Sequence, residues 1–213
     1  MELLGYGEDA LTYWAITQRL DALLQPFGDS AAATGTVFFR PSFGRRSSSW
    51  NEDPSRRGAQ FGEFDSIIST EAAVYLIEAK WSSSGEVEPD RIVLRAEQIR
   101  RHRVFGRYLT LWGEQSPATW EEFHSRNPAL EIQGLAGRSE SCETAPVGSR
   151  LARNLTTVLT CCARVGKPVR DVILVVHPGA QPELKPRSGP EGFQVVEIDC
   201  PAMRDGFILL GDT

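Results

Sequence analysis

The chain has few of the residues that build a zinc site or a disulfide framework. Its 213 residues include four cysteines and three histidines, and no two cysteines form a C-x-x-C pair. Cys161 and Cys162 are adjacent, which does not suit a simple disulfide framework. We therefore expect no zinc site, and we expect reduced cysteines that mostly fill the core, as in a cytosolic protein.

Long apolar runs and a secretion signal are also missing. No apolar stretch is long enough to span a membrane, and the acidic start at Met1–Asp9 is unlike a signal peptide. The chain has no internal repeat, no coiled-coil heptads and no glycine-rich phosphate loop. These absences predict a soluble cytoplasmic protein with no membrane partner.

An excess of positive charge is the third absence. There are 23 Lys and Arg against 28 Asp and Glu, for a formal net charge of −5. This counts against a polycation that coats nucleic acid, although a metal-dependent nuclease needs only a local basic surface around an acidic centre. The 41% apolar and 24% charged fractions are ordinary for a globular protein, and the length suits a single domain over residues 1–213.

Three charged residues lie inside an otherwise apolar stretch at residues 62–81. The sequence predicts two strands there, Gly62–Ser69 and Ala73–Trp81, because both are rich in aromatic and branched side chains and a small polar segment joins them. The first strand contains Asp65, and the second contains Glu78 and Lys80. Charges in a half-buried sheet are costly unless they are paired or hold a cation.

The strand period places two of these charges together. Glu78 and Lys80 share a face and lie roughly 6.5–7 Å apart along the strand. With a turn centred near residues 70–71, Asp65 lies across from the region of Leu76 and Ile77, within reach of Glu78. Two interpretations follow: a Mg²⁺ site made by two carboxylates, or a Glu78–Lys80 ion pair on the solvated face of an edge strand.

The arrangement of Asp65, twelve further residues and then Glu78-Ala79-Lys80 resembles the core of the PD-(D/E)XK nuclease superfamily. Phe64 stands where the family name has proline. The resemblance implies a restriction-endonuclease-like fold. It also implies a metal site formed by Asp65, Glu78 and the main-chain carbonyl of Ala79, with Lys80 beside the attacking water. The implied cofactor is Mg²⁺, with Mn²⁺ as a substitute.

An amphipathic helix is predicted from Glu8 to Leu24. Glu8 and Asp9 lie in its first turn, where either carboxylate interacts favourably with the helix dipole. The resemblance offers another role, because members of the superfamily often add an acidic residue from the first helix to the metal site. We choose Glu8 for that role, since Asp9 falls on the same stripe as Ile16 and is suited to capping.

Two basic segments flank the strand pair. The Gly/Ser/Pro-rich loop at residues 41–58 contains Arg45 and Arg46, which suit phosphate contact or simply a solvated loop. A helix predicted from Arg91 to about Trp112 is the most basic stretch, and its candidate contacts to nucleic acid are Arg91, Arg95, Arg101 and His102. On that helix Gln98 sets a polar amide into an apolar stripe, and a buried amide needs partners. By resemblance Gln98 is a candidate catalytic residue; a merely solvated basic face is the alternative.

The remaining pattern predicts the elements that complete an α/β sheet. A strand is expected at residues 36–40, a helix from Ser116 or Pro117, a helix from residue 148 or 149 to 164, and strands at 171–177, 193–199 and 207–210; residues 127–147 are expected to be irregular. This order favours a central mixed sheet flanked by helices, with a core at about residues 8–112 and residues 149–213 completing the sheet. His177, at the end of its strand, is expected to be structural.

Together the residues and the resemblance predict a Mg²⁺-dependent nuclease that hydrolyses DNA. By family association it is an endonuclease of restriction or phage-defence type, acting as a homodimer or in a larger defence complex. The alternative is a module of the same fold without the chemistry, which binds nucleic acid or a protein partner.

Overall fold

A computed structural model describes residues 2–29, 35–44, 60–134, 137, 139–179, 186–201 and 203–212. The chain divides into two compact units. The first, here called the sheet unit, comprises Met1–Phe39, Asp65–Leu94 and Arg170–Thr213. The second, the helical unit, comprises Arg40–Phe64 and Arg95–Val169.

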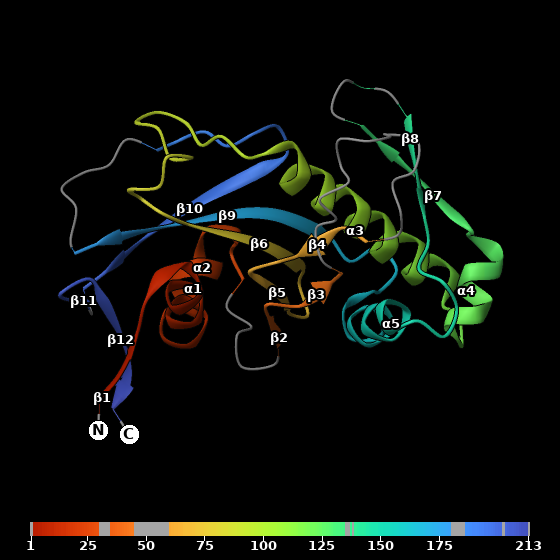
Figure 1. The fold of residues 1–213 in the computed structure, drawn as a ribbon, viewed down its shortest axis with the longest axis horizontal. Coiled ribbons are helices and arrows are strands. Elements are labelled where there is room, and N and C mark those ends of the chain that lie inside the picture. Colours follow the sequence, from red (N-terminus) through yellow and green to blue (C-terminus); the bar gives the residue numbers. More distant parts are fainter. Residues whose placement is uncertain are drawn as a thin grey trace. The chain divides into compact units, whose positions relative to one another are not determined.

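The sheet unit is built on a mixed five-stranded sheet in the order β10-β9-β6-β5-β2 (Figure 1). The meander of β2, β5 and β6 is antiparallel, and β9 and β10 pair in parallel. The strands are β2 (Thr36–Phe39), β5 (Ser66–Ser69), β6 (Val74–Trp81), β9 (Val169–Pro178) and β10 (Phe193–Cys200). The α/β class and the central mixed sheet expected from the sequence are confirmed.

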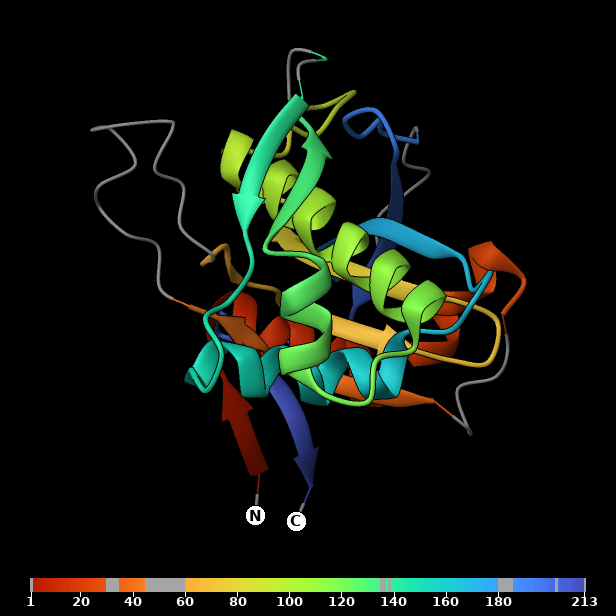
Figure 2. The same ribbon diagram turned by 90° about the vertical axis from the view of Figure 1, so that its right-hand side faces the viewer.

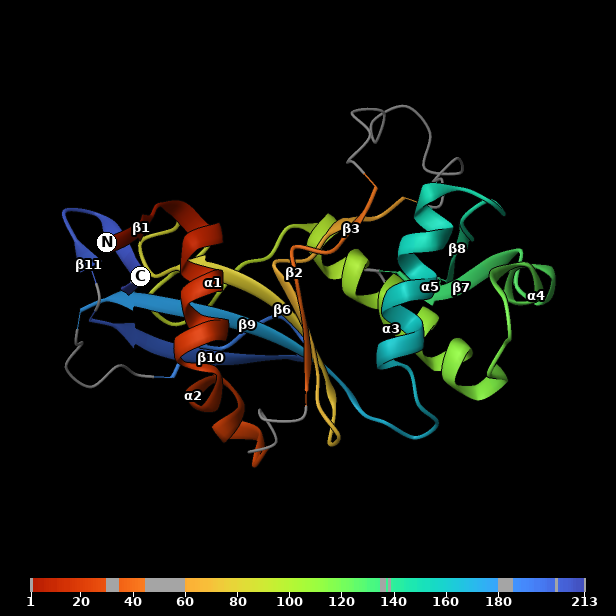
Figure 3. The ribbon, with the colours of Figure 1, turned by 90° about the horizontal axis from the view of Figure 1, so that it is seen from below.

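Two short helices, α1 (Gly7–Gln18) and α2 (Leu20–Leu24), lie across one face of this sheet (Figure 3). A single helix over residues 8–24 is wrong, because Arg19 leaves the helical conformation at φ −134° and ψ 22°. After this break Leu23 and Leu24 are both fully buried. A single turn of 3₁₀-helix, η1 (Gln25–Phe27), follows.

Strand β6 is buried on both faces except at its last residue. Tyr75, Ile77 and Ala79 alternate into the core under α1 and α2. Because side chains alternate along a strand, Glu78 and Lys80 point to the opposite face. The apolar strand predicted at 171–177 lies within β9, where residues 172–177 are buried and Asp171 is partly buried.

A buried polar contact secures the turn between β5 and β6. Asp29 is 5% exposed, and its Oδ2 accepts hydrogen bonds from the hydroxyls of Thr70 (2.6 Å) and Tyr75 (2.7 Å). Burial and the neighbouring Asp29 carboxylate raise the pKa of Tyr75, so this hydroxyl stays a donor. The hairpin that contains Asp65 and Glu78 is thus fixed at its closed end.

Both ends of the described chain meet in a small antiparallel sheet of order β1-β12-β11 (Figure 1). Its strands are β1 (Glu2–Gly5), β11 (Met203–Arg204) and β12 (Phe207–Asp212). The strand predicted at 207–210 exists, but it pairs with β1 and β11 rather than with the central sheet. Strand β1 had no signal in the sequence because its four residues are too few to show a period.

The helical unit packs α3 (Ala96–Gln115) along the hairpin of β7 (Ala129–Gln133) and β8 (Ser139–Glu143) (Figure 2). Helices α4 (Trp120–Arg126) and α5 (Arg150–Cys162) and the two-stranded pair β3 (Ser42–Phe43) and β4 (Gly62–Glu63) complete it. Its core is aromatic and includes Phe43, Phe61, Phe64, Phe105, Tyr108, Trp112, Trp120 and Phe123.

Four sequence expectations for residues 62–147 need correction. The helix expected from Ser116 or Pro117 begins only at Trp120, with Thr119 as its N-cap. Residues 127–147 are not irregular, because β7 buries Leu130 and Ile132 in alternation and pairs with β8. The basic helix begins at Ala96 rather than Arg91. The expected strand 62–69 is interrupted, with β4 ending at Glu63 and β5 starting at Ser66.

The helix expected from residue 148 or 149 is confirmed, with Ser149 as its N-cap: the side chain accepts from the Ala152 amide at 3.1 Å. All four cysteines are free, and three of them are buried as core fillers. Within the part of the chain described by the structure, no helix is both long and apolar enough to cross a membrane.

Candidate functional site

The β5–β6 pairing decides where Asp65 lies. Ser66 pairs with Ile77, so continuing the ladder by one residue sets Asp65 opposite Glu78. The expected position, across from Leu76 and Ile77, is one to two residues away, because the turn closes later, between Thr70 and Ala73. The carboxylate is held there, since Asp65 Oδ2 accepts a hydrogen bond from the Ala79 amide at 2.8 Å.

Lys80 is the charged centre of this site. Its side chain is 3% exposed, and its ammonium lies 3.3 Å from Glu78 Oε1 and 2.8 Å from Glu86 Oε2. The Glu78 side chain is 5% exposed. The solvated edge-strand interpretation is therefore wrong, because β6 lies between β5 and β9 and both charges are buried.

Carboxylates surround this ammonium. Burial alone would lower the pKa of Lys80, but the charges of Glu78 and Glu8 and the hydrogen bond to Glu86 together raise it above its ordinary value. Glu8 is half-buried at the start of α1, whereas Asp9 is exposed. The structure thus brings together Asp65, Glu78 and Lys80, three of the predicted site residues, while Glu8 acts on Lys80 through its charge.

Glu86 is a member of the site that sequence reasoning missed. It belongs to the acidic segment at residues 86–90, where the pattern indicated only a turn. No motif marks such a residue, because its contact with Lys80 depends on how the loop after β6 folds back. The excess of acidic residues directly after Glu78-Ala79-Lys80 was the one available signal.

The donor atoms suit a hard divalent cation. Asp65 and Glu78 offer carboxylate oxygens and Ala79 a main-chain carbonyl, and Mg²⁺ commonly uses one or two carboxylates while it keeps several waters. Among the described residues, no group of three or more His, Cys, Asp or Glu side chains is arranged to hold a metal ion. A cation at this site would need the main-chain carbonyl and water as well as the two carboxylates.

A second charged cluster lies on the same face of the sheet. Val176 and Ile198 point into the core under α1 and α2, so the strand alternation turns His177 and Glu197 to the face of Glu78 and Lys80. His177 is 2% exposed, and its Nε2 lies 2.6 Å from Glu197 Oε2, which also accepts from Arg187. These contacts agree with the structural role expected for His177.

Gln98, Arg101 and His102 are placed in the helical unit with packing contacts of their own. Gln98 is 1% exposed, and its Oε1 accepts from the Arg95 amide at 2.8 Å at the start of α3. The partner that a buried amide needs is thus supplied here by the main-chain amide of Arg95, at the start of α3. The predicted catalytic role of Gln98 stays a prediction.

The basic candidates differ in exposure. Arg101 is 5% exposed, donates to the Glu63 carbonyl and lies over the Phe64 ring at 5.4 Å. His102 is 1% exposed and packs edge-on against Phe64. Their contact with nucleic acid stays a prediction, since neither side chain lies on the surface. Arg91 and Arg95 are exposed, and Arg45 and Arg46 lie outside the described residues.

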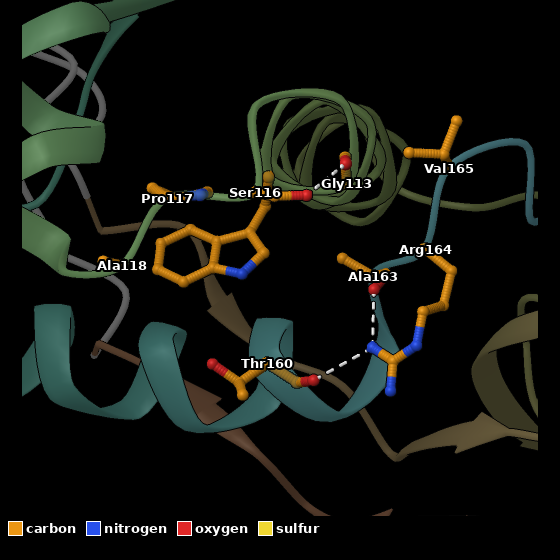
Figure 4. A pocket seen from close by; sticks show the side chains of 9 residues that line it. Gly113, Ser116, Pro117, Ala118, Thr160, Ala163, Arg164 and Val165 are labelled. Carbon is orange, nitrogen blue, oxygen red and sulfur yellow. Dashed lines mark hydrogen bonds between the residues drawn. The ribbon is translucent and has the colours of Figure 1, made fainter.

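A pocket of about 360 Å³ lies in the helical unit between the end of α3 and the end of α5 (Figure 4). Its lining includes Trp112, Pro117, Ala118 and Val165. The guanidinium of Arg164 donates to the carbonyls of Thr160 (3.1 Å) and Ala163 (2.8 Å), so it serves the end of α5 (Figure 4). Among the described residues that line this pocket Arg164 is the one charged side chain, so the lining lacks the acidic groups that the sheet unit gathers around Lys80.

Comparison with family models, with curated proteins and with solved structures finds no match to this chain. The assignment of function therefore depends on the geometry of the site.

The Glu8→Gln variant tests whether the first helix contributes to the metal site. We expect it to weaken Mn²⁺ binding by about tenfold while the protein stays folded, because it removes one of the charges near Lys80. Isothermal titration with Mn²⁺ measures this. Asp9→Asn is the matched control, since it removes a charge from the same helical turn at an exposed position. An unaltered titration of Glu8→Gln would remove Glu8 from the site.

Proposed function

We propose that this protein is a Mg²⁺-dependent nuclease of restriction-endonuclease-like fold that hydrolyses DNA phosphodiester bonds. The observation that carries the proposal is the grouping of Asp65, half-buried directly before β5, with the buried Glu78 and Lys80 of the adjacent strand β6. Burying a carboxylate and an ammonium is costly, and well-packed apolar residues of similar volume often stabilise a fold as well or better. Ionisable side chains gathered in and beside a sheet in this way are candidates for a functional site.

The order of elements supports the same proposal. A helix (α1), three antiparallel strands (β2, β5, β6), a further helix (α3) and a strand that joins the sheet next to β6 (β9) follow one another along the chain. This is the layout that the resemblance predicts. Asp65 directly precedes the second strand of the meander and the Glu78-Ala79-Lys80 segment lies on the third, which supports the proposal.

Each residue has a defined task in the proposed reaction. Asp65, Glu78 and the Ala79 carbonyl would hold the cation, and the hydrogen bond from the Ala79 amide orients Asp65 for that purpose. When bound, Mg²⁺ supplies a more acidic water and neutralises charge on the scissile phosphate. Lys80 would orient the attacking water and offset the negative charge that develops in the transition state.

The substrate would be held by basic residues outside the metal site. Arg91 and Arg95 are exposed, and guanidinium groups bind phosphate through paired hydrogen bonds. Contacts of this kind do not depend on base sequence and position the backbone. By family association we propose a restriction or phage-defence setting and action as a homodimer or in a larger defence complex.

The Arg95→Ala variant is expected to weaken DNA binding and to reduce the slope of log K against log salt by about 1, as for one lost phosphate contact. Fluorescence anisotropy with a labelled duplex over a salt series measures both. Arg107→Ala is the matched control on the same helix, because Arg107 is also exposed and was not a candidate. Equal slopes for wild type and Arg95→Ala would make Arg95 a bystander.

A cleavage panel tests the function itself. Purified protein is incubated with single-stranded, double-stranded, modified and branched DNA and with RNA, in Mg²⁺, in Mn²⁺ and in EDTA. We expect cleavage of at least one DNA substrate with either metal and none in EDTA. Cleavage that persists in EDTA, or no cleavage of any substrate with metal, would contradict the proposal.

A further inference from the structure

Lys80 makes its shortest ionic contact with a residue outside the strand pair. Its Nζ lies 2.8 Å from Glu86 Oε2 and 3.3 Å from Glu78 Oε1. Glu86 is 22% exposed at the side chain, so water reaches this carboxylate but hardly reaches the ammonium. The orientation of the ammonium is therefore set at least as much by the loop after β6 as by the strand itself.

The backbone of Glu86 is held on both sides. Its amide donates to Ser84 Oγ at 3.3 Å, and its carbonyl accepts from the Val93 amide at 2.8 Å. Val87 and Ile92 form an antiparallel bridge directly beside it. Since the main chain is fixed before the side chain is considered, the Glu86 carboxylate is presented to Lys80 without a large loss of conformational entropy.

The loop is also tied to the second charged cluster. Arg187 Nε donates to the Glu88 carbonyl at 2.9 Å, and Ser188 exchanges hydrogen bonds with Asp90 and Ile92. Arg187 is in turn paired with Glu197, which lies 2.6 Å from His177 Nε2. Residues from β9, β10 and the segment before β10 thus fix the loop from which Glu86 reaches Lys80.

Because Glu78 is assigned to the cation in the proposed function, its carboxylate has two competing partners. Glu86 is not one of the proposed metal ligands, so it can stay ion-paired with Lys80 when Glu78 binds the cation. We infer that Glu86 is a positioning residue, which holds the Lys80 ammonium in place beside Glu78 for the attacking water. This inference rests on the proposed function, and it adds a residue from outside the Asp65…Glu78-Ala79-Lys80 pattern.

The test compares Glu86→Gln with Glu88→Gln. Both variants remove one negative charge from the same loop, but Glu88 is paired with the exposed Arg91 rather than with Lys80. With the best DNA substrate and saturating Mg²⁺, we expect Glu86→Gln to lower kcat about tenfold with KM within about twofold of wild type, because only the alignment of Lys80 is lost. Glu88→Gln should leave kcat unchanged, because it alters only the surface pair with Arg91, a proposed phosphate contact. Glu86→Asp keeps the charge but shortens the side chain, and it should fall between wild type and Glu86→Gln.

A second measurement follows Lys80 without using activity. The ¹H–¹⁵N signal of a buried, ion-paired ammonium is protected from exchange with water, and comparison with Lys80→Arg assigns it. We expect Glu86→Gln to weaken or remove this signal and Glu88→Gln to leave it unchanged. An unchanged signal in Glu86→Gln would overturn the positioning of Lys80 by Glu86, whether or not the protein cleaves DNA.

The two proposals fail in different ways. If wild type cleaves DNA and Glu86→Gln has an unchanged kcat, the positioning role is overturned while the nuclease assignment stands. If wild type cleaves nothing, the nuclease assignment is overturned and the positioning role falls with it. A lower kcat in Glu86→Gln together with a lost ammonium signal supports both.

Discussion

Replacing Asp65 by Asn, or Glu78 by Gln, is expected to lower metal-dependent DNA cleavage by about a thousandfold, because each removes a charged cation ligand worth several kcal/mol to the transition state. Asp65→Asn is the sharper variant. An asparagine side-chain oxygen can still accept the hydrogen bond from the Ala79 amide, so the strand end keeps its geometry while the charge is lost. Initial rates of plasmid nicking over a Mg²⁺ series measure the effect.

Controls for this prediction come from acidic residues outside the grouping. Asp9→Asn and Glu71→Gln each remove one negative charge from an exposed position of the same unit, and both are expected to cleave within about twofold of wild type, as is usual for surface substitutions away from a site. Asp65→Asn or Glu78→Gln proteins that cleave as fast as these controls would remove the two carboxylates from the reaction. Circular dichroism of each variant confirms that the comparison is between folded proteins.

Lys80→Met is expected to lower the free energy of unfolding by about 3–5 kcal/mol, because it leaves the buried Glu78 carboxylate without its ammonium. Methionine is nearly isosteric with lysine, so the loss reports the charge rather than a cavity. The double variant Lys80→Met/Glu78→Gln should recover much of this loss, since it removes the uncompensated charge as well. Urea denaturation followed by circular dichroism measures all three proteins.

The control for Lys80→Met is Arg91→Met. Arg91 is 62% exposed at the side chain and pairs with Glu88 on the surface, so its loss should hardly change the urea midpoint. If Lys80→Met were as stable as Arg91→Met, the buried Glu78 carboxylate would not depend on Lys80 for its stability. Lys80→Met should also be inactive. A stable, active variant would exclude Lys80 both from stabilising Glu78 and from the proposed reaction.

The sequence predicted the central part of the fold well, for a local reason. The β5–β6 hairpin, β9 and α5 each have a strong apolar pattern and clear turn or capping residues. Such patterns depend only on a few neighbouring residues. Asp65, Glu78 and Lys80 were marked by the same logic, because charges inside apolar strands contradict the pattern around them. Whether they lie together depends on the register in which β5 and β6 pair.

The missed features depend on contacts between distant segments. Glu86 reaches Lys80 through a loop that is fixed by Arg187 and Ser188, about a hundred residues further along the chain. The hairpin of β7 and β8 was missed because only Leu130 and Ile132 alternate into the core, too short a run to indicate a strand. The burial of Arg101 follows from its contacts with Glu63 and Phe64, which no helical period reveals.

Anomalous diffraction from crystals soaked in Mn²⁺ tests the central claim most directly. We predict a peak within about 2.0–2.3 Å of a carboxylate oxygen of Asp65, a carboxylate oxygen of Glu78 and the Ala79 carbonyl, with Glu86 still on Lys80. No peak between these three groups at saturating Mn²⁺, with Glu78 still paired to Lys80, would contradict the account.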